Sequence, residues 1–176
     1  PSRRSALGEL LARRPPTLSD GGRFSPRTDD PAAAAVAAVL ELDRSYLCVQ
    51  GPPGTGKTYT AARCIAALVA RGSRVGVMAV SHRAISNLMA RALAMVAEER
   101  ADGESEAIGA LKIGGAASEL AELQAAAHAA APASAPTTPA GEAAGDGDGP
   151  LRVRQLRGAG ELKEGDLDDE RIIGGT

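Results

Sequence analysis

Aromatic residues are scarce in this chain of 176 residues, which has no Trp and contains only Phe24, Tyr46 and Tyr59. Many proteins that bind single-stranded nucleic acid stack its bases on several aromatic rings. Three rings cannot form such a platform. A nucleic-acid partner would therefore have to be held mainly through its phosphates.

Long apolar runs are also lacking, because Arg, Gly or Asp interrupts each run before it reaches the roughly 18 residues of a membrane-spanning helix. We therefore expect a soluble protein with no membrane partner. The two cysteines, Cys48 and Cys64, lack the paired spacing of metal ligands. We expect both to be buried apolar thiols of a cytoplasmic protein.

Positive charge is concentrated in the first part of the chain. Residues 1–100 hold 14 Lys and Arg against 8 Asp and Glu, whereas residues 101–176 hold 6 against 14. A basic region is compatible with a polyanionic partner. Since 17 of the 20 basic residues are Arg, a general preference for Arg also explains the pattern, so charge alone identifies no partner.

Alternating helix and strand signals predict an α/β fold. The first helix with clear boundary signals begins at Asp30, as N-cap, and Pro31. The elements expected after it are a strand over 46–50, a helix over 58–71, a strand over 74–80, a helix over 83–97, a strand over 111–113, an Ala-rich helix over 118–131 and a strand over 151–156. Their short connections indicate a parallel sheet with flanking helices.

Composition divides the chain into four ranges. They are an irregular approach segment with one short helix (1–30), a core (31–114), a low-complexity insertion expected to be disordered (115–150) and the start of a continuing lobe (151–176). The chain begins at Pro1 without Met and stops in what looks like an unfinished strand at Thr176. We therefore expect it to be a piece of a longer protein.

The strongest motif is Gly51-Pro-Pro-Gly-Thr-Gly-Lys-Thr58, which has the spacing of a phosphate-binding loop. Its glycines permit the backbone angles and close approach that a phosphate requires, and the following helix adds positive charge at its N-terminus. Lys57 and Thr58 are the predicted catalytic residues: Lys57 would bridge the terminal phosphates and Thr58 would bind Mg²⁺. The predicted nucleotide site comprises Gly51, Pro52, Pro53, Gly54, Thr55, Gly56, Lys57, Thr58 and Tyr59.

The segment after the loop separates the classes of phosphate-loop protein. A kinase or an AAA-type ATPase should show an apolar strand ending in Asp or Asp-Glu, and a GTPase an Asn-Lys-x-Asp element; neither follows Lys57. Instead, Gln50-Gly-Pro-Pro-Gly-Thr-Gly-Lys-Thr-Tyr-Thr60 and Ser81-His-Arg-Ala-Ile-Ser-Asn87 resemble motifs I and Ia of superfamily 1 helicases. The resemblance is greatest to the 5′-to-3′ branch, which includes bacterial proteins with a RecB-like nuclease fused to the helicase.

This resemblance implies the first part of a RecA-like lobe, a P-loop NTPase with ATP and Mg²⁺ as cofactors. Ser81, His82 and Thr176 would contact single-stranded nucleic acid, with DNA favoured over RNA. The longer protein would supply a second RecA-like lobe and, in a fusion, a nuclease domain. The family's magnesium-site carboxylates and its adenine-reading Gln are missing here, so the isolated chain is expected not to hydrolyse ATP.

Other interpretations stay open from the sequence. Ser81 can be a simple helix cap, and His82 can be a helix-start histidine bonded to local backbone. At the level of function, the alternatives are an AAA-type ATPase or nucleotide kinase with an insertion, and a non-catalytic nucleotide-binding module.

Overall fold

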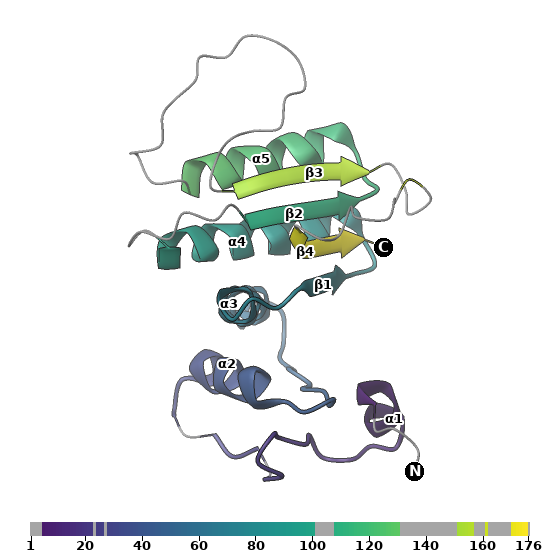
Figure 1. Cartoon of the computed structure of the whole chain (residues 1–176), viewed down its shortest axis with the longest axis vertical. Helices are drawn as coiled ribbons and strands as arrows, with labels where there is room; N and C mark the ends of the chain where they lie inside the picture. Colours follow the sequence, from purple (N-terminus) through teal and green to yellow (C-terminus); the bar gives the residue numbers. More distant parts are fainter. Residues whose placement is uncertain are drawn as a thin grey trace. The chain divides into compact units, whose positions relative to one another are not determined.

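The computed structural model describes residues 5–22, 24–26, 28–100, 108–130, 151–156, 161 and 170–175. The chain forms two compact units, Pro1–Leu68 and Val69–Thr176. Helices α1, α2 and most of α3 belong to the first unit, and the strands β1 to β4 with helices α4 and α5 belong to the second (Figure 1).

In the first unit, helix α2 (Pro31–Glu41) begins where the sequence predicts. The Asp30 side chain accepts a hydrogen bond from the Ala32 N–H at 2.9 Å, and this bond is the main reason why the pKa of the Asp30 carboxyl is lowered. The side chains that α2 buries are small, namely Ala32, Ala34, Ala35 and Ala38.

Helix α1 (Ala6–Leu11) is joined to the chain after α2 through a buried carboxylate. Glu9 accepts hydrogen bonds from the Thr17 hydroxyl (3.1 Å) and from the Ser45 hydroxyl. An antiparallel bridge between Leu18 and Leu42 lies beside these contacts in the sequence. The approach segment is therefore organised by long-range polar contacts that its composition does not reveal.

The strand expected over 46–50 is not formed, and this prediction was wrong. A strand needs a hydrogen-bonded neighbour. The Leu18–Leu42 bridge is the only β pairing within the part of Pro1–Leu68 that the structure describes, and β1 to β4 all belong to the other unit. The segment forms no helix or strand, and Val49 is half exposed.

The cysteines also differ from expectation. Cys48 is exposed, because its segment joins no sheet, and Cys64 on α3 (Lys57–Ala70) is half-buried. Burial raises the pKa of the Cys64 thiol, with only partial compensation from the charge of Arg63.

We expect an Ellman-type reagent at pH 7.5 to modify Cys48 about tenfold faster than Cys64. The thiolate is the reactive form, and burial of Cys64 both raises its pKa and restricts the access of the reagent, whereas Cys48 is exposed. The measurement is the biphasic release of the coloured thiol, with Cys48→Ser as the control that should remove the fast phase alone. Equal rates for the two thiols would contradict the burial of Cys64.

In the second unit, a four-stranded sheet has the order β1-β4-β2-β3, with every pair parallel. The strands are β1 (Val75–Met78), β2 (Ile108–Ile113), β3 (Leu151–Leu156) and β4 (Glu170–Gly175). This arrangement confirms the predicted α/β fold with a parallel sheet. The chain-terminal strand β4 lies between β1 and β2, so distant segments build the centre of the sheet.

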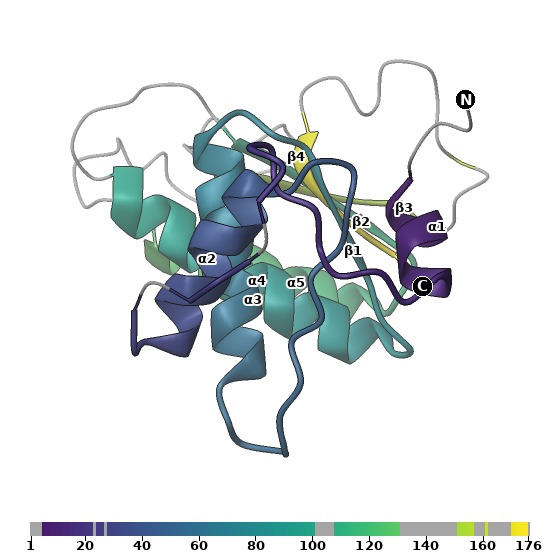
Figure 2. The same cartoon turned by 90° about the horizontal axis from the view of Figure 1, so that it is seen from below.

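Helices α4 (His82–Arg100) and α5 (Ala117–Ala130) pack on each other and lie on one side of this sheet (Figure 2). The buried apolar side chains of α4 include Ile85, Met89, Ala92, Leu93 and Val96. A β-carbon on Gly174 of β4 would lie 2.4 Å from the Met89 sulfur, so glycine permits α4 to approach the sheet closely.

The strand expected over 74–80 is shorter in the structure, where β1 covers Val75–Met78. It lies at one end of the strand order, and Gly76 and Met78 are exposed on it. Helix α5 confirms the Ala-rich helix expected over 118–131, while residues 131–150 of the expected insertion lie outside the described part of the chain. None of the helices within the described ranges is long and apolar enough to span a membrane.

Two methionines of this unit differ strongly in exposure, so together they test how α4 packs on the sheet. Met89 is fully buried and Met78 is 85% exposed. We expect Met89→Ala to lower the free energy of unfolding by about 2 to 5 kcal/mol, because it leaves a cavity beneath α4. Met78→Ala should change it by less than about 0.5 kcal/mol in urea titrations followed by circular dichroism. Similar losses for both would contradict the placement of α4.

Candidate functional site

The loop Gly51–Thr58 leads into helix α3, which begins at Lys57. Gly54 and Gly56 have φ angles of +83° and +82°, in the region that other residues rarely adopt. A β-carbon at either position would meet no atom within 4 Å. Both glycines are therefore required by backbone conformation, and the space around them is open.

Gly51 is required for a different reason. A β-carbon there would lie 2.6 Å from the Thr55 hydroxyl oxygen, which in turn donates a hydrogen bond to the Pro52 carbonyl at 2.8 Å. Thr55 thus closes the loop on itself. The sequence motif leaves this position unspecified, so the role of the Thr55 hydroxyl could not be predicted from spacing.

The Lys57 ammonium lies across the loop and donates to the carbonyl oxygens of Gly51 (2.7 Å) and Pro52 (2.6 Å). Thr58 is exposed next to it, and the first turn of α3 contains no acidic residue. The positive end of the helix is therefore not neutralised by a neighbouring carboxylate of its own first turn. A lysine, a hydroxyl and a helix N-terminus beside open glycines form a donor set that fits a triphosphate with Mg²⁺.

Tyr59 follows the loop on the first turn of α3 and is 43% exposed. The Arg63 guanidinium lies 5.8 Å from the centre of its ring, within the range of a cation–π contact. Arg63 also pairs with Asp30 at 3.2 Å, which connects α3 with the start of α2. Tyr59 and the loop residues predicted for the nucleotide site are thus contiguous in one unit.

Ser81 and His82 lie in the second unit, where α4 begins after β1. The Ser81 hydroxyl accepts a hydrogen bond from the Ala84 N–H at 3.2 Å, which confirms its role as a helix cap. His82 is half-buried, and its ring packs against the Gly114–Gly115 turn after β2. The third predicted contact, Thr176, lies outside the described residues.

Sequence reasoning missed a buried polar group close to His82. Lys112 at the end of β2 is fully buried, and its Nζ atom donates to the Gly114 carbonyl (2.8 Å) and to Glu119 (2.9 Å). Gln155 of β3 donates to the carbonyls of Gly114 (2.9 Å) and Gly115 (3.0 Å). The only available signal was a single lysine inside an otherwise apolar strand.

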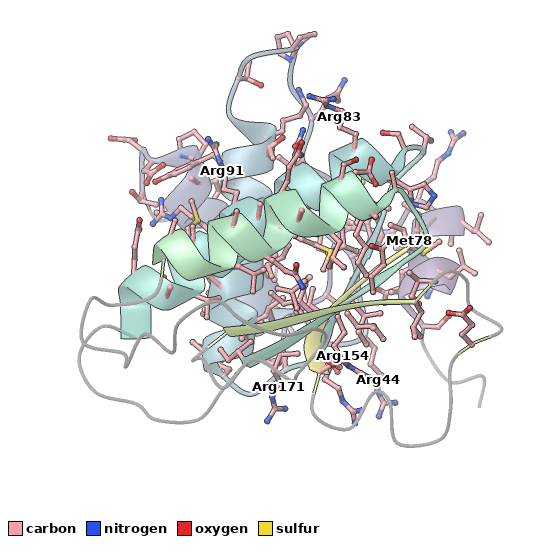
Figure 3. The ribbon with its side chains drawn as sticks, turned by 90° about the horizontal axis from the view of Figure 1, so that it is seen from above. Arg44, Met78, Arg83, Arg91, Arg154 and Arg171 are labelled. Carbon is pink, nitrogen blue, oxygen red and sulfur yellow. The ribbon has the colours of Figure 1, made fainter. Side chains whose placement is uncertain are left out.

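Two arginines on the strands are engaged locally. Arg154 of β3 pairs with the buried Glu170 at 2.9 Å, and Arg171 of β4 donates to the Gly72 carbonyl at 2.9 Å. Arg83 and Arg91 of α4 are exposed and point away from the sheet (Figure 3). Within the described ranges, no group of three or more His, Cys, Asp or Glu residues is placed to hold a metal ion.

The model of a family described as an AAA domain matches residues 27–137, which include α2, the loop Gly51–Thr58, α3 and the Ser81–His82 segment. Searches of curated proteins and of solved structures returned no significant match. The family match confirms the predicted superfamily, while the 5′-to-3′ branch and the nuclease fusion stay predictions. The chain belongs to this AAA domain family, a helicase-like family of P-loop proteins in superfamily 1.

Proposed function

We propose that this chain is the ATP-binding part of an ATP-dependent nucleic-acid helicase or translocase. The observation that carries the proposal is the loop itself, with two positive-φ glycines facing open space and a lysine held across it. The family match adds support for a helicase-like protein over a nucleotide kinase.

Binding of a triphosphate would exchange one set of Lys57 contacts for another. Its present partners are the neutral carbonyls of Gly51 and Pro52. Charge-assisted hydrogen bonds to phosphate are about twice as strong as bonds to neutral acceptors. Lys57 would therefore move from the carbonyls to the terminal phosphates, while backbone N–H groups at Gly54 to Thr58 hold the remaining oxygens.

Thr58 would bind Mg²⁺ through its hydroxyl, with phosphate oxygens and water as the other ligands. A Mg²⁺ ion held by Thr58 would supply the positive charge that phosphoryl transfer requires near the phosphates. The sequence offers no Asp-Glu strand to orient the attacking water. The proposal therefore assigns nucleotide binding to this chain, without steady turnover.

Single-stranded nucleic acid would contact Ser81 and His82 at the start of α4. Ser81 already accepts a hydrogen bond from the backbone through its hydroxyl oxygen, and its O–H group can still donate to a phosphate. The Nδ1 atom of His82 is buried, so the imidazole would make its contact through Nε2. The contact is small and polar, in keeping with a chain that has almost no aromatic residues.

The nucleotide site is tested by calorimetric titration of the full chain with Mg·ATP. We expect saturable, weak binding, and a loss of at least about tenfold in affinity for Lys57→Ala, because one charged contact to phosphate is removed. Arg91→Ala removes the same charge from an exposed position on α4 and should have little effect. Equal affinities of the wild-type chain and Lys57→Ala would contradict the proposal.

The nucleic-acid contact is tested by fluorescence anisotropy with labelled oligonucleotides of deoxythymidine and uridine, each about 20 nucleotides long. We expect affinity to fall steeply with salt and His82→Ala to weaken binding about fivefold to tenfold at low salt. Asn87→Ala, which changes an exposed residue of the same helix, is the control. An affinity that changes neither with salt concentration nor with His82→Ala would exclude this contact. The ratio of the affinities for the two oligonucleotides reports any preference for DNA over RNA.

A further inference from the structure

The His82 ring is seated on the backbone of a neighbouring turn. A β-carbon built on Gly114 would lie 2.8 Å from Cε1 of His82, and one built on Gly115 would lie 3.3 Å from Cβ of His82. Real β-carbons almost never approach as closely as the first of these distances. The position of the imidazole therefore depends on where this turn lies.

Polar contacts from three directions hold the turn in place. The Gly114 carbonyl accepts hydrogen bonds from Lys112 (2.8 Å) and Gln155 (2.9 Å), and the Gly114 N–H donates to the Leu156 carbonyl at 2.7 Å. Glu119 fixes the Lys112 ammonium from α5 at 2.9 Å. A β-carbon on Gly115 would collide with both members of this ion pair, so the pair fills the space beneath the turn.

A buried lysine at this position is not explained by stability. Removing charges from water is costly, and replacing a buried ion pair by apolar residues of similar volume is often neutral or stabilising. The other residues of β2 are apolar, and all of them except Ile113 are buried, so Met or Leu would fit its pattern. What an apolar residue cannot do is donate to a main-chain carbonyl, and that contact is the one Lys112 makes with Gly114.

We propose that Lys112 is a positioning residue: through the Gly114–Gly115 turn it holds the His82 imidazole in the orientation that contacts single-stranded nucleic acid. The inference rests on the proposed contact of His82 with nucleic acid. If so, strand β2 and the Gly114–Gly115 turn belong to the nucleic-acid-binding site, although both are distant in sequence from Ser81 and His82.

The test uses Gly114→Ala, with Gly72→Ala as its matched control. The two glycines have nearly the same φ, +76° and +78°, so the backbone cost of alanine is similar at both. Only at Gly114 would the new β-carbon meet the imidazole, since nothing lies within 4 Å at Gly72. A difference between the two variants therefore isolates displacement of His82 from backbone strain.

Each change is made with His82 present and with His82→Ala, and affinities for the deoxythymidine oligomer and for Mg·ATP are measured on the full chain. We expect Gly114→Ala to weaken DNA binding about fivefold to tenfold when His82 is present and less than about twofold when it is absent. Lys112→Met should give the same pattern. Gly72→Ala should leave DNA binding unchanged, and no variant should change ATP affinity by more than about twofold.

The outcomes separate the inference from the function on which it rests. If His82→Ala alone leaves DNA affinity unchanged, the proposed contact and the inference both fail. A second outcome is that His82→Ala weakens DNA binding, but Gly114→Ala either has no effect or has the same effect with and without His82. In that case Lys112 and the turn do not act through His82, and only the inference fails. Melting curves accompany every variant, and where Lys112→Met does not fold, the Gly114 cycle decides.

Discussion

The backbone conformation of Gly54 and Gly56 is the constraint on which the nucleotide site depends. Both residues have positive φ, a region in which a β-carbon costs roughly 1 to 2 kcal/mol. Their angles set the path of the chain from Pro53 into α3, and that path places Lys57 where it reaches back to Gly51 and Pro52. A different conformation at either glycine would separate the lysine from the loop and from the first amides of the helix.

Two lysines of this chain show how burial and partner decide what an ammonium group can do. Lys57 is bound to neutral carbonyls in an accessible loop, so a more strongly charged acceptor can displace them. Lys112 is fully buried, and its partner Glu119 already carries a full negative charge. The hydrogen bond from Lys112 is the main reason why the pKa of the Glu119 carboxyl is lowered. The first arrangement suits exchange with a ligand, whereas the second suits a fixed structural contact.

Local signals predicted the helices well and the strands less well. The caps at Asp30 and Ser81 depend on residues within one turn, and the structure confirms both. The segment 46–50 has the composition of a strand, but a strand also needs a partner, which sequence alone cannot supply. The strand order, with β4 inserted between β1 and β2, and the burial of Lys112 likewise depend on contacts between distant residues.

Two sets of glycines in the described part of the chain differ in a way that the sequence cannot reveal. At Gly54 and Gly56 a β-carbon would point into open space, so the absence of a side chain leaves room that a ligand can enter. At Gly114, Gly115 and Gly174 the same space is already filled by side chains of this protein, so glycine there serves packing. Positive φ alone does not separate the groups, because Gly114 shares it with Gly54. Open space that lies beside Lys57, Thr58 and the first turn of α3 is therefore the physical basis for assigning a ligand to the loop. The filled space at Gly114 and Gly115 supports a positioning role for the turn after Lys112.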